Sequence, residues 1–120
     1  MTRILLTGSR AWTDDLAIRV ALAPYRHAER PAVLVHGDCR GADRIAAATW
    51  RCWRLADEPH PADWATHGRA AGILRNRHMV TLGAVVCLAF IRDDSPGATH
   101  CARLATDAGI PTRYYRQVTA

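Results

Sequence analysis

Short runs of consecutive apolar residues alternate along this chain with segments of helical spacing, and that alternation restricts the folds it can adopt. The runs at residues 4–6, 32–36 and 84–90 are rich in branched side chains and lie beside glycine or proline, which is typical of short buried strands. Each run is followed by a turn and then by a helical pattern. Strands that alternate with helices in this way form βαβ units around a mostly parallel sheet. The sequence therefore predicts an α/β domain of three layers, with helices on both faces of the sheet.

Capping residues, glycines and prolines delimit the expected helices. The first helix follows Asp14 or Asp15 and ends at Pro24 or near residue 27, with Leu16 and Val20 at helical spacing. Three further helices share a glycine near one end and are expected over residues 42–50, 68–82 and 98–108. The helix over 68–82 has three expected apolar contacts, at Ile73, Leu74 and Met79. Two short strands complete the sheet and are expected within residues 57–61 and over 112–115.

The length and composition are those of one globular domain. The chain has 120 residues, of which 49% are hydrophobic and 22% charged, and these values are ordinary for a single domain. No apolar run approaches the roughly 20 residues that span a bilayer, and the N-terminal run is too short for a secretory signal. We therefore expect one domain over residues 1–120, located in the cytoplasm and without membrane contact.

The four cysteines are spread along the chain without a C-x-x-C pair. Free thiols are therefore expected, as in a reducing compartment. Side chains of metal-ligand type occur at His36, Asp38, Cys39, His100 and Cys101, but they lack the paired spacings of a structural zinc site. We expect no bound metal.

The net charge of +5 is carried by arginine alone, because all 16 basic residues are arginines. A basic protein attracts polyanions, so a nucleic-acid partner is one possible function. The arginines are scattered instead of clustered, however, which favours a solvated basic surface over a nucleic-acid groove. Nucleic-acid binding is accordingly kept as an alternative of low rank.

Three glycine-containing turns follow the expected strands, at residues 8–10, 37–41 and 95–99. Each opens a helix, whose free N–H groups and dipole attract anions. In open α/β sheets the carboxyl ends of strands border a crevice where ligands bind. The turns therefore predict a phosphate-binding crevice, and tight turns without a ligand are the alternative for any one of them. The candidate ligand-binding residues in and beside these turns are Gly8, Ser9, Arg10, Gly37, Asp38, Gly41, Asp43, Gly97 and Thr99.

None of the three turns matches a cofactor fingerprint. The full G-x-G-x-x-G pattern is absent, and the chain has no lysine for a P-loop. Ordinary NAD or ATP binding is thereby disfavoured, and no cofactor is expected. Asp43 has two interpretations, as a cap of the helix that follows it or as an acceptor for ribose hydroxyls.

A second group of candidates lies on the expected helix over 68–82. Gly72, Arg75, Asn76 and Met79 are spaced three and four residues apart, so they share one face of that helix. Arg75 could place a bidentate guanidinium in the crevice as a phosphate clamp, with Asn76 beside it. The alternative is a surface arginine in an ion pair.

Two tryptophans in expected loops could hold a nucleotide base. The flat rings of Trp12 and Trp64 can stack on a base, and packing over the edge of the core is the alternative for each. His36 and His100 could assist proton transfer if they line the crevice, although a structural role is also open to them.

Several short motifs, taken together, resemble the YspA/YpsA-related branch of the SLOG superfamily over nearly the whole chain. They are Gly8-Ser9-Arg10-x-Trp12, His36-Gly37-Asp38-x-x-Gly41-Ala42-Asp43, Pro61-Ala62-Asp63-Trp64, Gly72-x-x-Arg75-Asn76-x-x-Met79 and Gly97-x-Thr99. The resemblance implies a Rossmann-like fold, a nucleotide or nucleotide-derived ligand, and a homodimer.

The related LOG phosphoribohydrolases cleave the N-glycosidic bond of nucleoside monophosphates with an arginine and a glutamate. This chain keeps Arg75 and Met79 of the arginine motif, but Asn76 replaces its lysine and Ala102 stands where the glutamate is expected. Glycosidic cleavage passes through a cation-like transition state that a carboxylate stabilises and a methyl group does not. Hydrolysis by the family mechanism is therefore not expected. Aspartates that could substitute for the glutamate occur at Asp38, Asp43, Asp93 and Asp94.

Three functions follow in order of preference. The first is the binding or sensing of a nucleotide-derived phosphorylated ligand at the carboxyl edge of the sheet. The second is nucleotide hydrolysis at the glycosidic bond, and the third is nucleic-acid binding or a pure interaction role. The first requires that Gly8, Gly37, Gly41 and Gly97 share one crevice, and that Arg75 and Thr99 face it.

Overall fold

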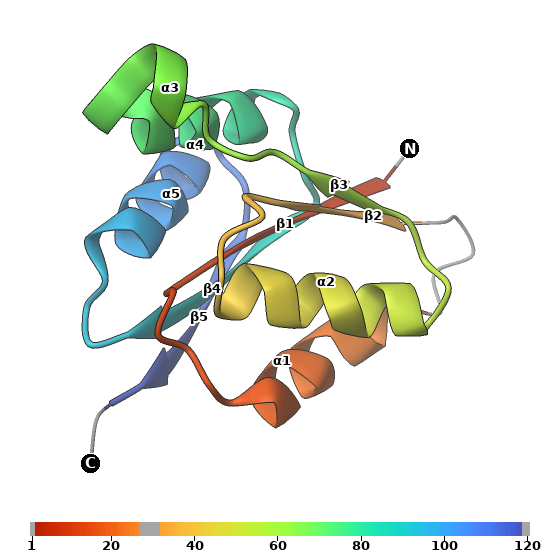
Figure 1. Cartoon of the computed structure of the whole chain (residues 1–120). Helices are drawn as coiled ribbons and strands as arrows, with labels where there is room; N and C mark the ends of the chain where they lie inside the picture. The colour runs from red at the N-terminus through yellow and green to blue at the C-terminus, as the bar shows by residue number, and fades with distance from the viewer. Residues whose placement is uncertain (1, 27–31, 119–120) are drawn as a thin grey trace.

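The computed structural model describes residues 2–26 and 32–118 of the chain. Its centre is a five-stranded sheet in the order β3-β2-β1-β4-β5, in which every pair of neighbouring strands is parallel (Figure 1). The strands are β1 (Thr2–Gly8), β2 (Ala32–His36), β3 (Asp57–Pro59), β4 (Val86–Arg92) and β5 (Thr112–Gln117). The parallel sheet predicted from the alternating pattern is confirmed.

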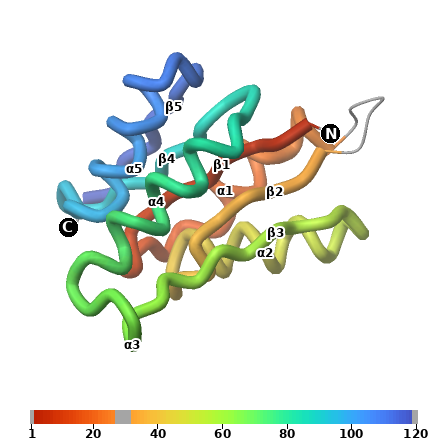
Figure 2. Tube along the Cα trace, turned by 90° about the horizontal axis from the view of Figure 1, so that it is seen from above, coloured from red at the N-terminus to blue at the C-terminus, as the bar shows by residue number. Residues whose placement is uncertain are grey.

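Helices cover both faces of this sheet, as the Rossmann-like prediction requires. One face carries α1 (Asp15–Leu22) and α2 (Ala42–Cys52), and the other carries α4 (Ala71–Thr81) and α5 (Pro96–Asp107) (Figure 1). Three shorter elements, η1 (Ala23–Tyr25), α3 (Trp64–His67) and η2 (Gly68–Ala70), lie in the connections. Viewed from above, β1 runs between β2 and β4 through the middle of the sheet (Figure 2).

The two helical layers explain why the central strands are apolar at every position. Along β1, Ile4 and Leu6 belong to the core on the α1/α2 side, whereas Leu5 belongs to the core on the α4/α5 side. Successive side chains of a strand point to opposite faces. Because both faces are covered, a buried parallel strand reads as a continuous apolar run instead of an alternating one.

The face of α1 that contacts the core differs from the predicted one. Leu16 and Val20 are 58% and 65% exposed, and the buried residues are Ile18, Ala21 and Leu22. The helix carries apolar residues on two stripes, and periodicity alone does not tell which stripe the sheet covers.

The predicted helix over 68–82 is divided in two, η2 and α4, and a separate short helix, α3, precedes it. The Asp63 carboxylate caps α3 by accepting a hydrogen bond from the Thr66 N–H at 3.1 Å, and η2 then leads into α4. Gly68 has a φ of +55° at the junction, a left-handed conformation that ends α3. Met79 is buried as expected, but Ile73 and Leu74 are exposed.

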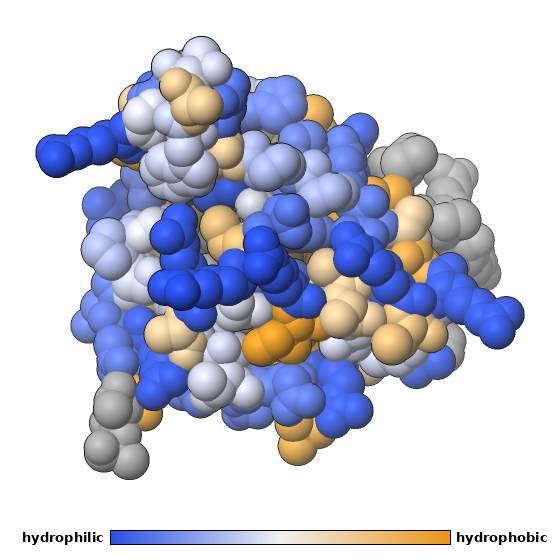
Figure 3. Space-filling view, in the orientation of Figure 1, coloured by the Kyte–Doolittle hydropathy of each residue, from blue (hydrophilic) through white to orange (hydrophobic). Residues whose placement is uncertain are grey.

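The face of the molecule shown in Figure 3 is largely polar. Hydrophilic side chains surround small separate apolar areas on the face shown in Figure 3. Within the described ranges, no helix combines the length and the apolar character needed to cross a bilayer.

The sheet order creates a switch point between β1 and β4. The chain leaves β1 toward β2, and β4 lies on the other side of β1, so the loops that follow β1 and β4 part from one another. Ser9 ties the two strand ends together, because its N–H donates to Phe90 O at 2.8 Å and its hydroxyl accepts from the Arg92 N–H at 2.8 Å. The candidate site lies beside this junction.

Candidate functional site

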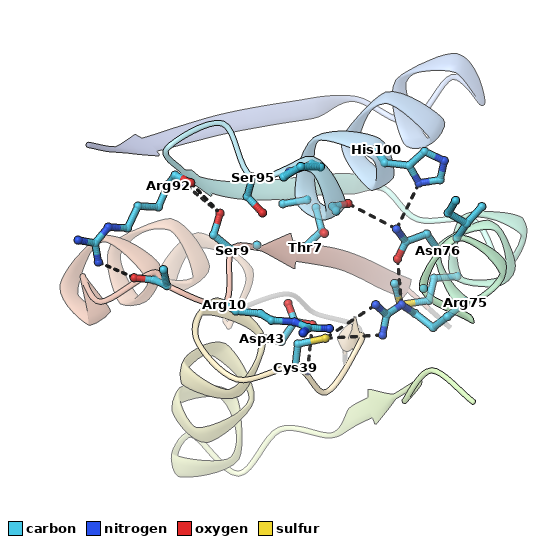
Figure 4. Close-up of a pocket in the computed structure, with 18 of the residues that line it drawn as sticks. Thr7, Ser9, Arg10, Cys39, Asp43, Arg75, Asn76, Arg92, Ser95 and His100 are labelled. Atoms are coloured by element: carbon cyan, nitrogen blue, oxygen red, sulfur yellow. Dashed lines mark hydrogen bonds between the residues drawn. The ribbon is translucent and has the colours of Figure 1, made fainter. Parts of the chain in front are cut away.

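A cavity of about 580 Å³ opens at the carboxyl ends of β1 and β4, a volume within the range of small-molecule sites. The loop after β1, the α2 loop, α4 and the start of α5 form its walls (Figure 4). It brings together seven of the residues predicted from sequence to bind a ligand: Gly8, Ser9, Arg10, Asp43, Arg75, Asn76 and Gly97.

The other predicted residues lie elsewhere. Gly37 and Asp38 line a smaller adjoining depression that shares Arg10 and Arg75 with the cavity. Gly41 lies behind the wall, where a Cβ atom would meet the carbonyl oxygen of Arg10 at 2.5 Å. All four turn glycines therefore lie at the same edge of the sheet, but only Gly8 and Gly97 line the cavity itself.

The predicted role of Thr99 at a helix start is wrong. Helix α5 begins at Pro96, two residues earlier than predicted, because proline has the φ of a first helical residue and needs no N–H partner. The Thr99 N–H and hydroxyl both donate to Ser95 O, at 3.1 and 2.8 Å. The N–H groups that precede the first helical hydrogen bond are those of Gly97 and Ala98, and both residues line the cavity.

The two tryptophans have different environments. Trp12 is 3% exposed, packs edge-on against Phe90 at 5.3 Å between ring centroids, and donates its Nε1–H to Asp14 O at 2.7 Å. It is a core residue and not a wall of the cavity, so packing is the correct one of its two interpretations. Trp64 is 50% exposed and lines the cavity.

The turn after β2 is already occupied by a carboxylate of the chain. Asp43 Oδ2 accepts hydrogen bonds from the N–H groups of Gly37 and Cys39, at 3.0 and 3.3 Å. These are the donors that a phosphate would need in a glycine-rich turn. The turn is therefore satisfied internally, and an anion in the cavity must use other donors.

His36, the last residue of β2, holds the same turn in place through hydrogen bonds of its ring. Its Nδ1 accepts from the Asp38 N–H at 3.0 Å, so the ring proton lies on Nε2 and is donated to Asp57 Oδ2 at 2.8 Å. Asp57 also binds Arg51 at 2.7 Å, and the hydrogen bond from that guanidinium holds the pKa of the Asp57 carboxyl below its usual value. His36 is fully buried and does not line the cavity, which makes it a positioning residue.

Arg75 is engaged mainly with the protein, and this changes the predicted clamp. Its Nη1 donates to Gly37 O at 2.8 Å and to His60 O at 3.2 Å, and its Nε donates to Asn76 Oδ1 at 2.9 Å. The one hydrogen-bond partner of Nη2 among the described residues is the Cys39 sulfur, at 3.8 Å. The guanidinium thus joins the turn after β2 to α4, and only Nη2 can meet a ligand without breaking these bonds.

Asn76 connects Arg75 to α5 through hydrogen bonds of its side-chain amide. With Oδ1 accepting from Arg75, its amide Nδ2 donates toward His100 Nδ1 at 3.3 Å, which leaves the other His100 ring nitrogen as a donor. Figure 4 shows Asn76 between Arg75 and His100 on one wall of the cavity. Asn76 is 5% exposed and lies beside Arg75, and its contact with a ligand stays a prediction.

The cavity wall is strongly cationic. Its arginines are Arg10, Arg69, Arg75 and Arg92, and Asp43 is the single carboxylate among the described lining residues. Arg92 is turned toward Ala11 O, to which it donates at 2.6 Å. Arg10 has neither a hydrogen bond nor an ion pair in the described ranges, and its guanidinium lies 5.8 Å from the Trp64 ring centroid. Arg69 is exposed and likewise has neither in the described part of the chain, so Arg10 and Arg69 are the lining arginines most available to an anion.

Asp43 is the titratable group most altered by this environment. Burial raises the pKa of its carboxyl from 3.8 to about 6, although the N–H groups of Cys39 and Gly37 and the electrostatic interactions with His36 and Arg75 lower it. Only one of its oxygens is used by the turn. The other, Oδ1, is buried and has no hydrogen-bond partner among the described residues.

Several lining residues carry no interpretable signal in the sequence. Arg69 and Ile73 reach the wall only because the chain turns at Gly68 between α3 and α4. Sequence indicates Cys39 only as a metal-ligand type, whereas its sulfur lies beside Arg75. Ala102 is fully buried against Ala89 and Ile91, away from the cavity.

A parallel sheet with a cavity at the point where its strand order reverses defines an α/β protein of Rossmann-like type. The chain belongs to the YAcAr family, because the model of this YspA, cpYpsA-related SLOG family matches residues 2–67. It is similar to the Gene 61 protein of Mycobacterium phage D29, with 47% identity over 117 residues that cover 92% of this chain and 94% of that protein. No solved structure matches it. The resemblance seen in the motifs is confirmed.

Proposed function

We propose that this protein binds a nucleotide-derived phosphorylated ligand in the cavity at the β1/β4 switch point. The observation that carries the proposal is the wall itself, in which the Arg10 guanidinium has neither a hydrogen-bond nor an ion-pair partner among the described residues, and Gly97 and Ala98 at the start of α5 line the same space. Unpaired guanidinium groups and helix N-termini are the two features that most commonly hold phosphate. Membership of a SLOG family supports a nucleotide as the source of that phosphate.

The exposed ring of Trp64 supports a ligand that also carries a base. The ring lines the cavity next to Arg10, and its Cη2 atom lies 3.4 Å from the position that a Cβ atom on Gly72 would take. A nucleobase can stack on such a ring, and the cation beside it favours the same flat arrangement.

Calorimetric titration with adenosine 5′-monophosphate and with adenosine tests the proposal. We expect the monophosphate to bind at least about tenfold more tightly, because each 1.4 kcal/mol of phosphate contact is one factor of ten. Arg10→Ala is expected to weaken monophosphate binding by about tenfold and to weaken adenosine binding by a smaller factor, because adenosine lacks the phosphate. Arg103→Ala on the outer face of α5 removes the same charge from an exposed position and serves as the control. Equal binding of the two compounds would contradict the proposal.

We further infer that binding is not followed by rapid hydrolysis. Glycosidic cleavage commonly uses a pair of carboxylates, and Asp43 is alone among the described lining residues. Incubation with adenosine 5′-monophosphate is expected to release adenine far more slowly than about 1 per second, as followed by chromatography. Release at that rate would support the hydrolase alternative instead, and Asp43→Asn would be the first variant to examine.

A second experiment identifies the ligand without a choice of probe. Protein purified from its expression host is denatured, and the released small molecules are measured by mass spectrometry. A phosphorylated nucleoside in stoichiometric amount would support the proposal, and its release should fall in the Arg10→Ala variant.

A further inference from the structure

Asp43 Oδ1 is one of four buried side-chain polar atoms without a hydrogen-bond partner among the described residues. Asp43 is 4% exposed, lines the cavity, and uses Oδ2 for the N–H groups of Gly37 and Cys39. Its Oδ1 has no hydrogen-bond donor in the described part of the chain. Buried acceptors are nearly always satisfied, so an unsatisfied one that borders a cavity marks the position of a donor on a bound molecule.

The lining residues also differ in depth. Ser9, Asp43 and Asn76 are buried at the floor of the cavity, whereas Arg10 and Trp64 are exposed at its mouth. Figure 4 shows Asp43 and Ser95 on opposite sides of the same space, with the start of α5 above. A phosphate is repelled by the Asp43 carboxylate and attracted by the α5 N-terminus and Arg10. The group that meets Asp43 must therefore be a neighbour of the phosphate and not the phosphate itself.

We propose that Asp43 Oδ1 accepts a hydrogen bond from a sugar hydroxyl of the ligand, so that the site selects ribonucleotides over nucleotides that lack those hydroxyls. The inference rests on the proposed function, because it assumes a phosphorylated nucleoside in the cavity. Sugar hydroxyls are the donors closest to a 5′-phosphate, and the base extends from the sugar toward Trp64 at the mouth. Asp43 thereby reads the sugar, while the cationic groups hold the phosphate.

The same contact couples binding to pH. A carboxylate accepts hydrogen bonds in its ionised form, and burial raises the pKa of Asp43 to about 6. The charged or titratable groups that face it are His36 from β2, Arg75 from α4 and Cys101 from α5. A ligand that requires the ionised form displaces a proton when it binds near pH 6. Affinity should therefore rise about tenfold from pH 5 to pH 8. His100 from α5 and Cys39 from the turn after β2 also line the cavity.

The experiment compares adenosine 5′-monophosphate with 2′,3′-dideoxyadenosine 5′-monophosphate by calorimetry at pH 7.5. These probes differ only in two hydroxyls, and the wild-type protein suffices, so no variant has to fold for the main comparison. We expect the dideoxy compound to bind about tenfold or more weakly, because a hydrogen bond to a charged acceptor is lost. The two monodeoxy compounds then assign the hydroxyl.

Asp43→Asn supplies the matched control. Its amide oxygen can still accept from Gly37 and Cys39, but the atom that replaces Oδ1 becomes an amide donor, and the charge is lost. We expect the ratio of the affinities for the ribose and dideoxy compounds to fall at least threefold in this variant. We also expect the variant to lack the part of the pH dependence of binding that the Asp43 carboxyl contributes. Subtracting the pH profile of Asp43→Asn from that of the wild type isolates this share, because the ionisation of the phosphate is common to both proteins and cancels.

The outcomes separate the two proposals. Equal binding of the ribose and dideoxy compounds to the wild type, or full discrimination in Asp43→Asn, would overturn the role of Asp43 and leave phosphate binding intact. Failure of both compounds to bind, with no phosphorylated nucleoside in the purified protein, would overturn the proposed function and this inference with it.

Discussion

Gly41→Ala is expected to lower the free energy of unfolding by about 2–4 kcal/mol, the sum of a left-handed backbone cost and an overpacking cost. Gly41 has a φ of +81°, and a Cβ atom there would collide with the backbone carbonyls of Ser9 and Arg10. Those carbonyls are held in place, since Ser9 O accepts from the N–H groups of Trp12 and Ala42. Denaturant unfolding followed by circular dichroism measures the change.

Gly109→Ala separates the two costs. Gly109 has nearly the same φ, +84°, but no heavy atom of the described residues lies within 4 Å of the Cβ position. We expect this variant to lose only the left-handed cost, about 1–2 kcal/mol. If both variants lost the same free energy of unfolding, the close approach between the start of α2 and the turn after β1 would not be what restricts the side chain at position 41.

The second large effect is a pH dependence of stability that Asp43 imposes. Its folded-state pKa of about 6 lies above the ordinary value of 3.8, so the folded protein holds the proton more tightly than the unfolded chain. The stabilisation from this proton is present at low pH, is lost as the pH rises from about 4 to 6, and stays lost above that. At about 1.4 kcal/mol per unit, this amounts to roughly 2–3 kcal/mol between pH 4 and pH 8.

The measurement compares unfolding of the wild type and Asp43→Asn at a series of pH values. The other groups, including Asp57 with its lowered pKa, contribute equally to both proteins. The stability difference between wild type and variant should therefore shift against the wild type by about 2–3 kcal/mol as the pH rises from 4 to 8. A difference that does not change with pH would show that Asp43 has an ordinary pKa and is not desolvated by its surroundings.

The sequence alone predicted the layered α/β fold and the edge of the sheet at which the site lies. Continuous apolar runs such as 86–91 report burial on both faces, and that property belongs to parallel strands covered by helices. Glycines after those runs indicate where strands end. Because the carboxyl ends of parallel strands share one edge, the positions of Gly8, Gly37 and Gly97 at one edge follow from these local signals.

Side-chain partners depended on tertiary structure. Arg75 binds either a phosphate or other parts of the chain, depending on how close the carbonyl oxygens of Gly37 and His60 lie to its guanidinium. Those two residues are far from Arg75 in sequence. Trp12 and Trp64 both lie beside turns, yet one packs against Phe90 and the other faces the cavity. In α1, two apolar stripes were available, and the position of the sheet decided that Leu16 and Val20 stay exposed.

Asp43 shows most clearly which properties the sequence determines and which depend on tertiary structure. Its sequence position near a helix start fits both a cap and a ligand contact, and the two interpretations cannot be separated there because each needs only an oxygen at that place. The fold gives one oxygen to the turn and leaves the other at the floor of a cationic cavity. Local patterns determine backbone class because they act over a few residues, whereas burial and the identity of partners are set by segments that only the folded chain brings together.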